Sequence, residues 1–151
     1  ATAAPVRKYT NRTSGIAFGP GGALYGCQEG SRRIICFLAD GSAGPTTTKF
    51  EGRNHNFPCH VAVDRTGRIW FSDAWSSQSA MGPIAYPLLD HQSVLRQTCS
   101  PPPQSHWRAE RVTFDTTSPR GIALSPDERT LYVANSDNVP GGVREIRAFD
   151  A

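Results

Sequence analysis

The 151-residue sequence predicts an all-β protein, a β-propeller of four-stranded blades in which about three blades, half of a six-bladed ring, are present. Three observations support this prediction. One short hairpin pattern occurs three times, no window has the apolar periodicity of a long helix, and the chain contains 14 glycines and 12 prolines. Tight turns between short strands need such residues, because glycine allows positive φ and proline presets the turn geometry.

Each copy of the repeat consists of a short apolar strand, a polar turn and a second strand with an aromatic residue. The copies span residues 15–27, 60–73 and 121–135, and their turns read Pro-Gly-Gly, Arg-Thr-Gly and Pro-Asp-Glu-Arg. A further strand is expected after each copy, over residues 33–41, 83–90 and 144–150. A β-sandwich also has many short strands, but it does not repeat one hairpin pattern at the spacing of a blade.

Residues 1–151 are interpreted as a single partial propeller domain whose blades start near residues 14, 59 and 120. The copies are 45 and 61 residues apart, and the first spacing matches a blade of about 40–50 residues. The longer spacing predicts an insertion, placed at the Pro-rich segment 98–107, because proline cannot donate to a strand ladder. Closed propellers typically have about four to eight blades. We therefore expect a longer native polypeptide or, as the less favoured alternative, a homodimer that closes a six-bladed ring.

Composition argues against several classes of partner. Fourteen of the sixteen basic residues are arginines scattered along the chain, so the net charge of +3 forms no basic stripe and no nucleic acid is expected as a partner. The longest apolar runs, such as Leu131–Ala134, are too short to cross a bilayer, so no membrane span is expected. The chain begins without methionine or a signal segment, which predicts a removed leader or a piece of a longer chain. Both a cytoplasmic and a secreted location stay open.

Four cysteines show no zinc-binding spacing and are expected to be free thiols, although Cys27 and Cys36 could face each other across a hairpin. The four are Cys27, Cys36, Cys59 and Cys99. The glycosylation sequon at Asn11 is too common a pattern to decide the compartment.

Several segments resemble one protein family. The stretch Gln28–Ile34, the loop before Ile69–Asp73 and the stretch Pro119–Asp127 are similar, in this order, to motifs of the SMP-30/gluconolactonase (regucalcin-like) family. The resemblance covers most of residues 14–151 apart from the Pro-rich segment. It implies a six-bladed propeller that hydrolyses sugar lactones with one divalent metal, usually calcium, in the central channel. Such a metal would polarise the ester carbonyl and activate water.

The sequence departs from the family pattern in the loops that carry this chemistry. Cys59 and His60 replace the Asn-Asp of one loop, and Arg120 replaces the metal-binding Asn of another. A guanidinium group is cationic and offers no lone pair, so Arg120 cannot coordinate calcium. The family's other usual ligands fall outside the matched region. No metal ligand can therefore be assigned on this chain, and calcium or another divalent metal stays an implication of the resemblance.

Propeller geometry predicts where a site would lie. The loops that lead into the inner strands and the loops that leave the second strands meet at one end of the ring. Catalytic candidates there are His60, Asp73 and Arg120, and substrate-binding candidates are Glu29, Cys59, Asn135 and Asp137, with Gln28 nearby.

Each of these candidates has a structural alternative. His60 could act as a general base with Asp73 orienting it or holding a cation, or it could be a hydrogen-bonded structural histidine. Arg120 could bind a carboxylate or phosphate, or simply pair with Glu29 or Asp137. A Cys59–His60 dyad is not predicted, because adjacent strand residues point to opposite faces.

Two functions follow from these residues. The chain is expected to belong to a lactonase-type hydrolase of sugar lactones with a divergent site. The alternative is a non-catalytic scaffold that has lost its metal and binds a small anionic ligand or a protein partner. The family resemblance favours the first, and Arg120 favours the second, since fold alone does not fix function.

Overall fold

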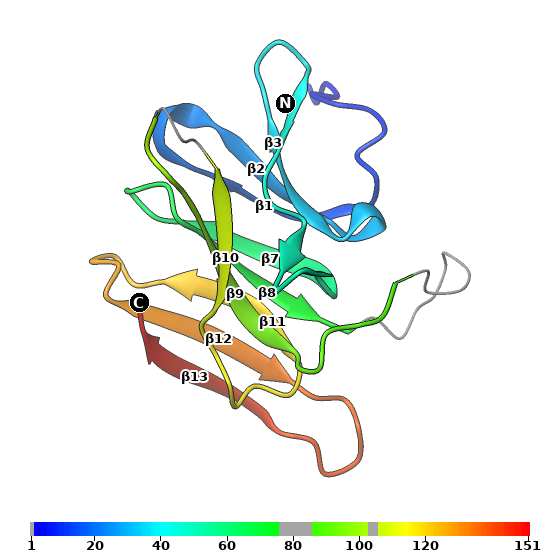
Figure 1. The fold of residues 1–151 in the computed structure, drawn as a ribbon, viewed down its shortest axis with the longest axis vertical. Coiled ribbons are helices and arrows are strands. Elements are labelled where there is room, and N and C mark those ends of the chain that lie inside the picture. Colours follow the sequence, from blue (N-terminus) through cyan, green and yellow to red (C-terminus); the bar gives the residue numbers. More distant parts are fainter. Residues whose placement is uncertain (1, 76–85, 103–105) are drawn as a thin grey trace.

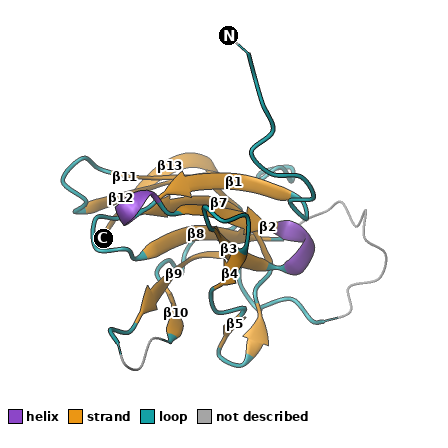
Figure 2. Cartoon of the chain, turned by 90° about the horizontal axis from the view of Figure 1, so that it is seen from above, coloured by secondary structure: helices purple, strands orange, loops and turns teal. Residues whose placement is uncertain are grey.

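The computed structural model describes residues 2–75, 86–102 and 106–151, which form antiparallel sheets joined by turns (Figures 1 and 2). The first sheet is built in order from β1 (Thr13–Phe18), β2 (Leu24–Gln28), β3 (Arg33–Phe37) and β4 (Ala43–Pro45). The second is built from β7 (Phe57–Val63), β8 (Ile69–Ala74), β9 (Ser93–Cys99) and β10 (Trp107–Arg111). The third contains β11 (Pro119–Leu124), β12 (Thr130–Ser136) and β13 (Arg144–Asp150). A small hairpin of β5 (Lys49–Phe50) and β6 (Arg53–Asn54) comes between the first two sheets in the sequence.

The three sheets are consecutive blades of a propeller. Figure 1 shows them one above the other, from blue through green to red, and the first strand β7 of the middle sheet packs against β1 on one side and β11 on the other. In the described residues two of the blades have four strands and the last has three. Helical structure in the described residues is limited to two single turns, Pro20–Gly22 and Glu29–Ser31. The predicted all-β class and partial propeller are therefore confirmed.

The middle blade differs from the expected arrangement of its later strands. A strand was expected over 83–90; residues 83–85 lie outside the described part of the chain, and residues 86–90 are not in a strand. The backbone groups of this segment form hydrogen bonds with side chains instead of with a neighbouring strand. Arg32 donates to the carbonyls of Tyr86 and Pro87, and the Leu89 N–H donates to the Asn56 side chain. The third strand of this sheet in the described residues is β9, which begins at Ser93.

The Pro-rich segment expected as an insertion over 98–107 joins β9 to β10. Cys99 and Trp107 face each other as the first pair of this hairpin, so the ends of the segment belong to strands. Residues 103–105 lie outside the described residues.

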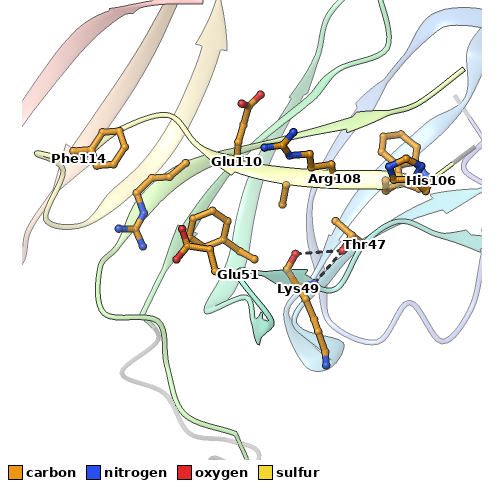
Figure 3. A pocket seen from close by; sticks show the side chains of 11 residues that line it. Thr47, Lys49, Glu51, His106, Arg108, Glu110 and Phe114 are labelled. Carbon is orange, nitrogen blue, oxygen red and sulfur yellow. Dashed lines mark hydrogen bonds between the residues drawn. The ribbon is translucent and has the colours of Figure 1, made fainter.

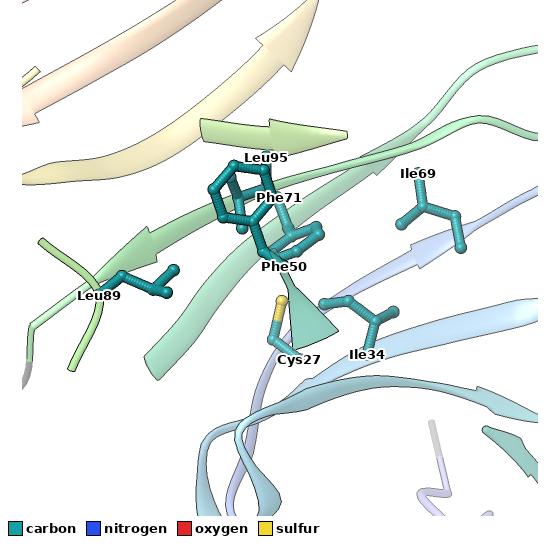
Figure 4. Packing of buried hydrophobic residues seen from close by; sticks show 7 residues of the cluster. All are labelled: Cys27, Ile34, Phe50, Ile69, Phe71, Leu89 and Leu95. Carbon is teal, nitrogen blue, oxygen red and sulfur yellow. The ribbon is translucent and has the colours of Figure 1, made fainter. Parts of the chain in front are cut away.

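Two apolar clusters hold the blades together. The first, between the first two blades, contains the buried residues Cys27, Ile34, Phe50, Ile69, Phe71, Leu89 and Leu95 (Figure 4). The second, between the middle and last blades, contains Trp70, Val94, Leu131 and Val133. Truncation of a large buried side chain in such a cluster typically costs about 3–5 kcal/mol. Burial of apolar surface between the blades thus fixes their relative positions.

The turns at the far end of each hairpin use side chains as backbone partners. The Asp64 carboxylate accepts hydrogen bonds from the backbone of Thr66 and Arg68 and from the Trp70 indole N–H. In the last blade the Ser125 hydroxyl occupies the same place and accepts from the Thr130 N–H. Gly67 has φ of 85°, a conformation that favours glycine in this turn.

All four cysteines are free, as expected. In the ladder between β2 and β3, Cys27 lies opposite Ile34 and Cys36 lies opposite Tyr25, so the two thiols do not face each other. Among the described residues no helix is long and apolar enough to cross a membrane.

Candidate functional site

The structure brings Cys59, Ser72 and Arg120 together where β7, β8 and β11 meet. The Arg120 guanidinium approaches the Cys59 sulfur at 3.8 Å and donates to the Trp75 carbonyl at 3.3 Å. The Ser72 hydroxyl donates to the Arg120 carbonyl at 2.6 Å and lies 3.6 Å from the Cys59 sulfur. The backbone of β11 and the side chain of Arg120 are thus held against the middle blade.

Arg120 has no acidic partner in the described part of the chain. The two pairings considered from the sequence do not form: Glu29 binds Arg12 at 3.0 Å, and the Asp137 carboxylate accepts from the Val139 N–H. Neutral acceptors such as a thiol and a carbonyl leave the charge of a guanidinium largely uncompensated. Arg120 is therefore available to an anionic group, because guanidinium groups form strong charge-assisted hydrogen bonds with carboxylates.

His60 lies on β7 with an exposed side chain, and its backbone N–H donates to the Ser72 hydroxyl at 3.2 Å. The structure does not bring His60 and Asp73 together, since the Asp73 carboxylate is fully buried and accepts from the Asn56 N–H at 2.8 Å. Cys59 contacts Ser72 and Arg120, and no Cys59–His60 dyad forms among the described contacts. The catalytic roles of His60, Asp73 and Arg120 stay predictions.

Asp73 occupies a position that has the same structural task in every blade. The equivalent residues are Gln28 and Asn135, and all three side chains are buried. Gln28 donates to the Thr10 carbonyl, Asp73 accepts from the Asn56 N–H, and Asn135 accepts from the N–H groups of two residues before β11. Each side chain at the end of a second strand therefore ties down the segment that leads into the inner strand of its own blade.

The environment of Asp73 is unusual for a carboxyl group. Complete burial raises its pKa to about 7, and the Asn56 hydrogen bond and the charges of Arg32 and Arg111 only partly oppose this effect. Its second oxygen, Oδ1, has no hydrogen-bond partner among the described residues. The hydroxyl of Ser93, its neighbour on β9, is buried as well and has no hydrogen-bond partner within the described part of the chain. Asp73 is thus a structural tether that is partly protonated near neutral pH.

Arg32 is the residue of this region that the sequence reasoning missed. Its buried guanidinium donates to the carbonyls of His55, Asn56, Tyr86 and Pro87 and lies over the ring of Phe57. It belongs to the first blade but fixes the segment leading into the second. The Glu-Gly-Ser-Arg-Arg motif containing Arg32 was the available signal, although the pattern does not show which of its two arginines points inward.

Asn56 completes this fixation. Its side-chain amide donates to the carbonyls of Asp73 and His91, and its oxygen accepts from the Leu89 N–H at 2.7 Å. Together with Arg32 it places the backbone immediately before Cys59. The other nominated residues, Glu29, Asn135 and Asp137, have the structural partners given above, and their substrate-binding roles stay predictions.

The described residues do not fit a divalent metal. They contain no group of three His, Cys, Asp or Glu side chains that could hold one. At the family's ligand position the Arg120 guanidinium donates hydrogen bonds, and the buried carboxylate of Asp73 lies in the field of two further arginines. These cationic donors disfavour a cation at this point.

Two grooves lie elsewhere on the molecule. One of about 580 Å³ runs between β5 and β10, and Glu51, Arg108 and Phe114 are among the residues that line it (Figure 3). The Arg111 guanidinium lies over the rings of Phe50 and Phe114. The other, of about 370 Å³, is lined by residues at the far ends of the hairpins, including Val63 and Glu128. Neither groove is lined by any residue nominated from the sequence.

Comparisons with known proteins agree with this architecture. A gluconolactonase from Xanthomonas campestris is 37% identical, with a TM-score of 0.76 over 94% of this chain and 45% of that structure. A putative gluconolactonase structure, 21% identical with a TM-score of 0.73, shows the same fold over 97% of this chain and 52% of its own.

A curated gluconolactonase from Zymomonas mobilis is 26% identical in an alignment of 132 residues that covers 83% of this chain and 34% of that protein. The chain thus spans between a third and about half of these relatives. The family described as SMP-30/Gluconolactonase/LRE-like region matches residues 3–150. With the repeats, the blade packing and this match in agreement, the chain belongs to the SMP-30/gluconolactonase family.

Proposed function

We propose that this chain contributes its blades to a lactonase-type hydrolase that opens sugar lactones. The observation that supports this most directly is the 37% identity to a gluconolactonase over 94% of the chain. Opening a lactone adds water to the ester carbonyl, breaks the acyl C–O bond and produces a carboxylate and a hydroxyl group on the same molecule. The reaction therefore needs a group that removes a proton from water and a group that stabilises the developing oxyanion.

In this proposal Arg120 supplies the oxyanion stabilisation and then holds the product carboxylate. Its charge meets no carboxylate in the described residues, and its position is fixed through its backbone by Ser72. His60, exposed on the neighbouring inner strand, is the proton acceptor in the proposal. The metal assistance implied by the family is not part of it, because the described residues supply no ligand set.

The experiment follows the acid released when an aldonolactone such as gluconolactone is opened. We expect Arg120→Gln to lower kcat/KM at least tenfold, which corresponds to about 1.4 kcal/mol of transition-state stabilisation, and Arg120→Lys to recover part of it. Arg129→Gln is the matched control, because Arg129 lies at the far end of the β11–β12 hairpin. We expect His60→Gln to lower kcat with little change in KM.

A second function is favoured by one observation, the presence of Arg120 where the family binds its metal. In that case the propeller is a non-catalytic scaffold for a small anionic ligand. Gluconate titrated calorimetrically into the protein would then bind in an Arg120-dependent manner, while no aldonolactone is hydrolysed. Hydrolysis that survives Arg120→Gln unchanged would contradict the roles proposed for Arg120 in both functions.

A further inference from the structure

The outer strand of the middle blade, β10, has one free edge. The strand order of this sheet is β10-β9-β8-β7, so β10 pairs with β9 on one side and ends the sheet on the other. Two blades of the chain flank the middle blade, and β10 therefore lies well inside the sequence. A strand edge of this kind carries backbone N–H and carbonyl groups that a further strand can satisfy.

The register of β10 determines which of its backbone groups point outward. Just beyond its end, the Val112 N–H donates to the Val94 carbonyl at 2.9 Å. Hydrogen-bonded and non-hydrogen-bonded pairs alternate along an antiparallel ladder, and the β9–β10 register is regular. The backbone groups of Arg108 and Glu110 therefore face β9. Three residues direct their N–H and carbonyl groups to the free edge, where no described residue forms a hydrogen bond with them: Trp107, Ala109 and Arg111.

The groove of about 580 Å³ follows this edge (Figure 3). Every residue of β10 lines it, and β5 contributes to its other wall. Successive side chains of a strand lie on opposite faces, so a groove that touches all of them runs along the edge of the strand and not over one face. The groove thus provides space beside β10 for an additional strand.

The order of side chains in β10 is self-complementary. The strand reads Trp-Arg-Ala-Glu-Arg, with Ala109 at its centre. In an antiparallel pairing of two copies with Ala109 opposite Ala109, Arg108 of each copy lies opposite Glu110 of the other. The backbone groups of Ala109 point outward, so this central pair is a hydrogen-bonded one. Arg108 and Glu110 then form the non-hydrogen-bonded pairs, in which facing side chains lie closest.

Both charged groups are available for such a contact. Arg108 is exposed and takes part in none of the ion pairs within the described part of the chain. Glu110 binds Arg96, but both contacts are to its Oε1, and its side chain is 46% exposed. Its Oε2 can therefore accept from a second cation. Charges on an edge strand usually oppose association, whereas opposite charges that face each other across two strands stabilise the pairing.

We propose that two copies of this chain pair edge to edge through β10, so that their middle blades form one continuous antiparallel sheet. The outward backbone groups of each copy satisfy those of the other, and an Arg108–Glu110 ion pair lies on each side of the central Ala109. The same surface is used by both copies, so the contact closes in a dimer and leaves no free edge for a filament. Because the contact is small, we expect the dimer to dissociate on dilution.

The proposed dimer does not depend on the proposed lactonase activity. β10 lies at the opposite end of its sheet from β7, the strand that carries Cys59 and His60. Substitutions in β10 should therefore change the mass of the assembly and leave lactone hydrolysis unchanged, while Arg120→Gln should do the reverse.

Sedimentation velocity over a dilution series measures the mass of the purified 151-residue chain. We expect a dimer that Arg108→Glu and Glu110→Arg each weaken at least tenfold, because each substitution places like charges opposite each other. An equimolar mixture of the two variants should restore the dimer, since both facing pairs are then of opposite charge. Arg129→Glu is the matched control, because it makes the same charge change at an exposed arginine at the far end of the β11–β12 hairpin.

Ala109→Pro tests the backbone pairing separately. Proline removes the outward N–H of Ala109 and leaves the hydrogen bonds between β10 and β9 in place, a position where edge strands accept proline. The dimer should be lost, and circular dichroism should show that this variant and the charge variants stay folded.

Three results would overturn the proposal. A wild-type chain that stays monomeric at every concentration tested does not pair through β10. A dimer that neither Arg108→Glu nor Ala109→Pro weakens uses a different surface. Charge variants that each lose the dimer but do not recover it on mixing would show that Arg108 and Glu110 do not face each other.

Discussion

Replacing Asp73 by asparagine should change how the stability of the protein depends on pH. The carboxyl is fully buried, and burial raises its pKa from 3.8 to about 7. Asparagine can keep the hydrogen bond from the Asn56 N–H, as Asn135 does for two N–H groups at the equivalent position of the last blade. The substitution therefore removes the titration while it preserves the tether.

The direction in which the free energy of unfolding changes with pH follows from the number of protons that the folded and unfolded chains bind. Between pH 3.8 and about 7 the unfolded chain releases the Asp73 proton while the folded chain keeps it. The stabilising contribution of the protonated carboxyl is complete below pH 3.8 and is lost as pH rises toward 7. One pKa unit corresponds to about 1.4 kcal/mol, so the free energy of unfolding of the wild type should fall by about 4 kcal/mol relative to Asp73→Asn.

Urea unfolding followed by tryptophan fluorescence, at pH values from about 4 to 8, measures this difference. Asp127→Asn is a suitable control, because that carboxyl is exposed and its hydrogen bond with Ser125 lowers its pKa, in the opposite direction to the pKa of Asp73. A difference between wild type and Asp73→Asn that is constant with pH would refute the reasoning. Retained lactone hydrolysis in the variant would identify Asp73 as a tether and not a catalytic acid or base.

Three further predictions concern the residues that position the site. Arg32→Met should lower the free energy of unfolding by about 3 kcal/mol or more, because four carbonyls lose their donor. Arg33→Met is the control, because Arg33 donates to the Gln28 side chain and not to these carbonyls. Equal losses of stability in chemical denaturation of the two variants would contradict this role of Arg32. Burial lowers the pKa of His55 from 6.5 to about 4. The free energy of unfolding should therefore fall by about 3 kcal/mol as the pH falls from 6.5 toward 4, because the unfolded chain binds the proton first. In urea unfolding, His55→Gln should remove this dependence on pH. Gly15→Ala should cost about 1–3 kcal/mol in thermal or urea unfolding, whereas Gly121→Ala should leave the monomer's stability nearly unchanged; equal effects would contradict the tight approach of β1 and β7.

The propeller could be predicted because its repeat is local. A hairpin of two short strands has a period-two apolar pattern and a turn of glycine, proline or aspartate, and each of these is visible within about 15 residues. The predicted first and second strands of all three blades are therefore present in the structure. The same repeat positions then identify Tyr25 and Trp70 as the aromatic residues that pack between blades.

The third strand of the middle blade could not be located in the same way. Residues 86–90 look like a strand by composition, but the groups that bind their backbone are side chains of residues far away in the sequence, Arg32 and Asn56. Long-range hydrogen bonds of this kind leave no periodic pattern. The contacts of the nominated site residues could not be predicted for the same reason. Nothing in the sequence shows that the Asp73 side chain is buried against the Asn56 N–H while His60 stays exposed.

The amino-acid sequence alone predicts three blade repeats, because these depend only on residue type and spacing. Its resemblance to a known family further implies that Arg120 replaces a side chain that binds a metal. Tertiary structure decides which polar side chains hold the backbone and which stay available. Arg32, Asn56 and Asp73 are buried and satisfy main-chain groups, since an unpaired group in the interior costs free energy. Arg120 has no carboxylate partner among the described residues, and the two acids considered from the sequence, Glu29 and Asp137, bind other groups. That difference separates the structural arginine from the one proposed to meet a ligand.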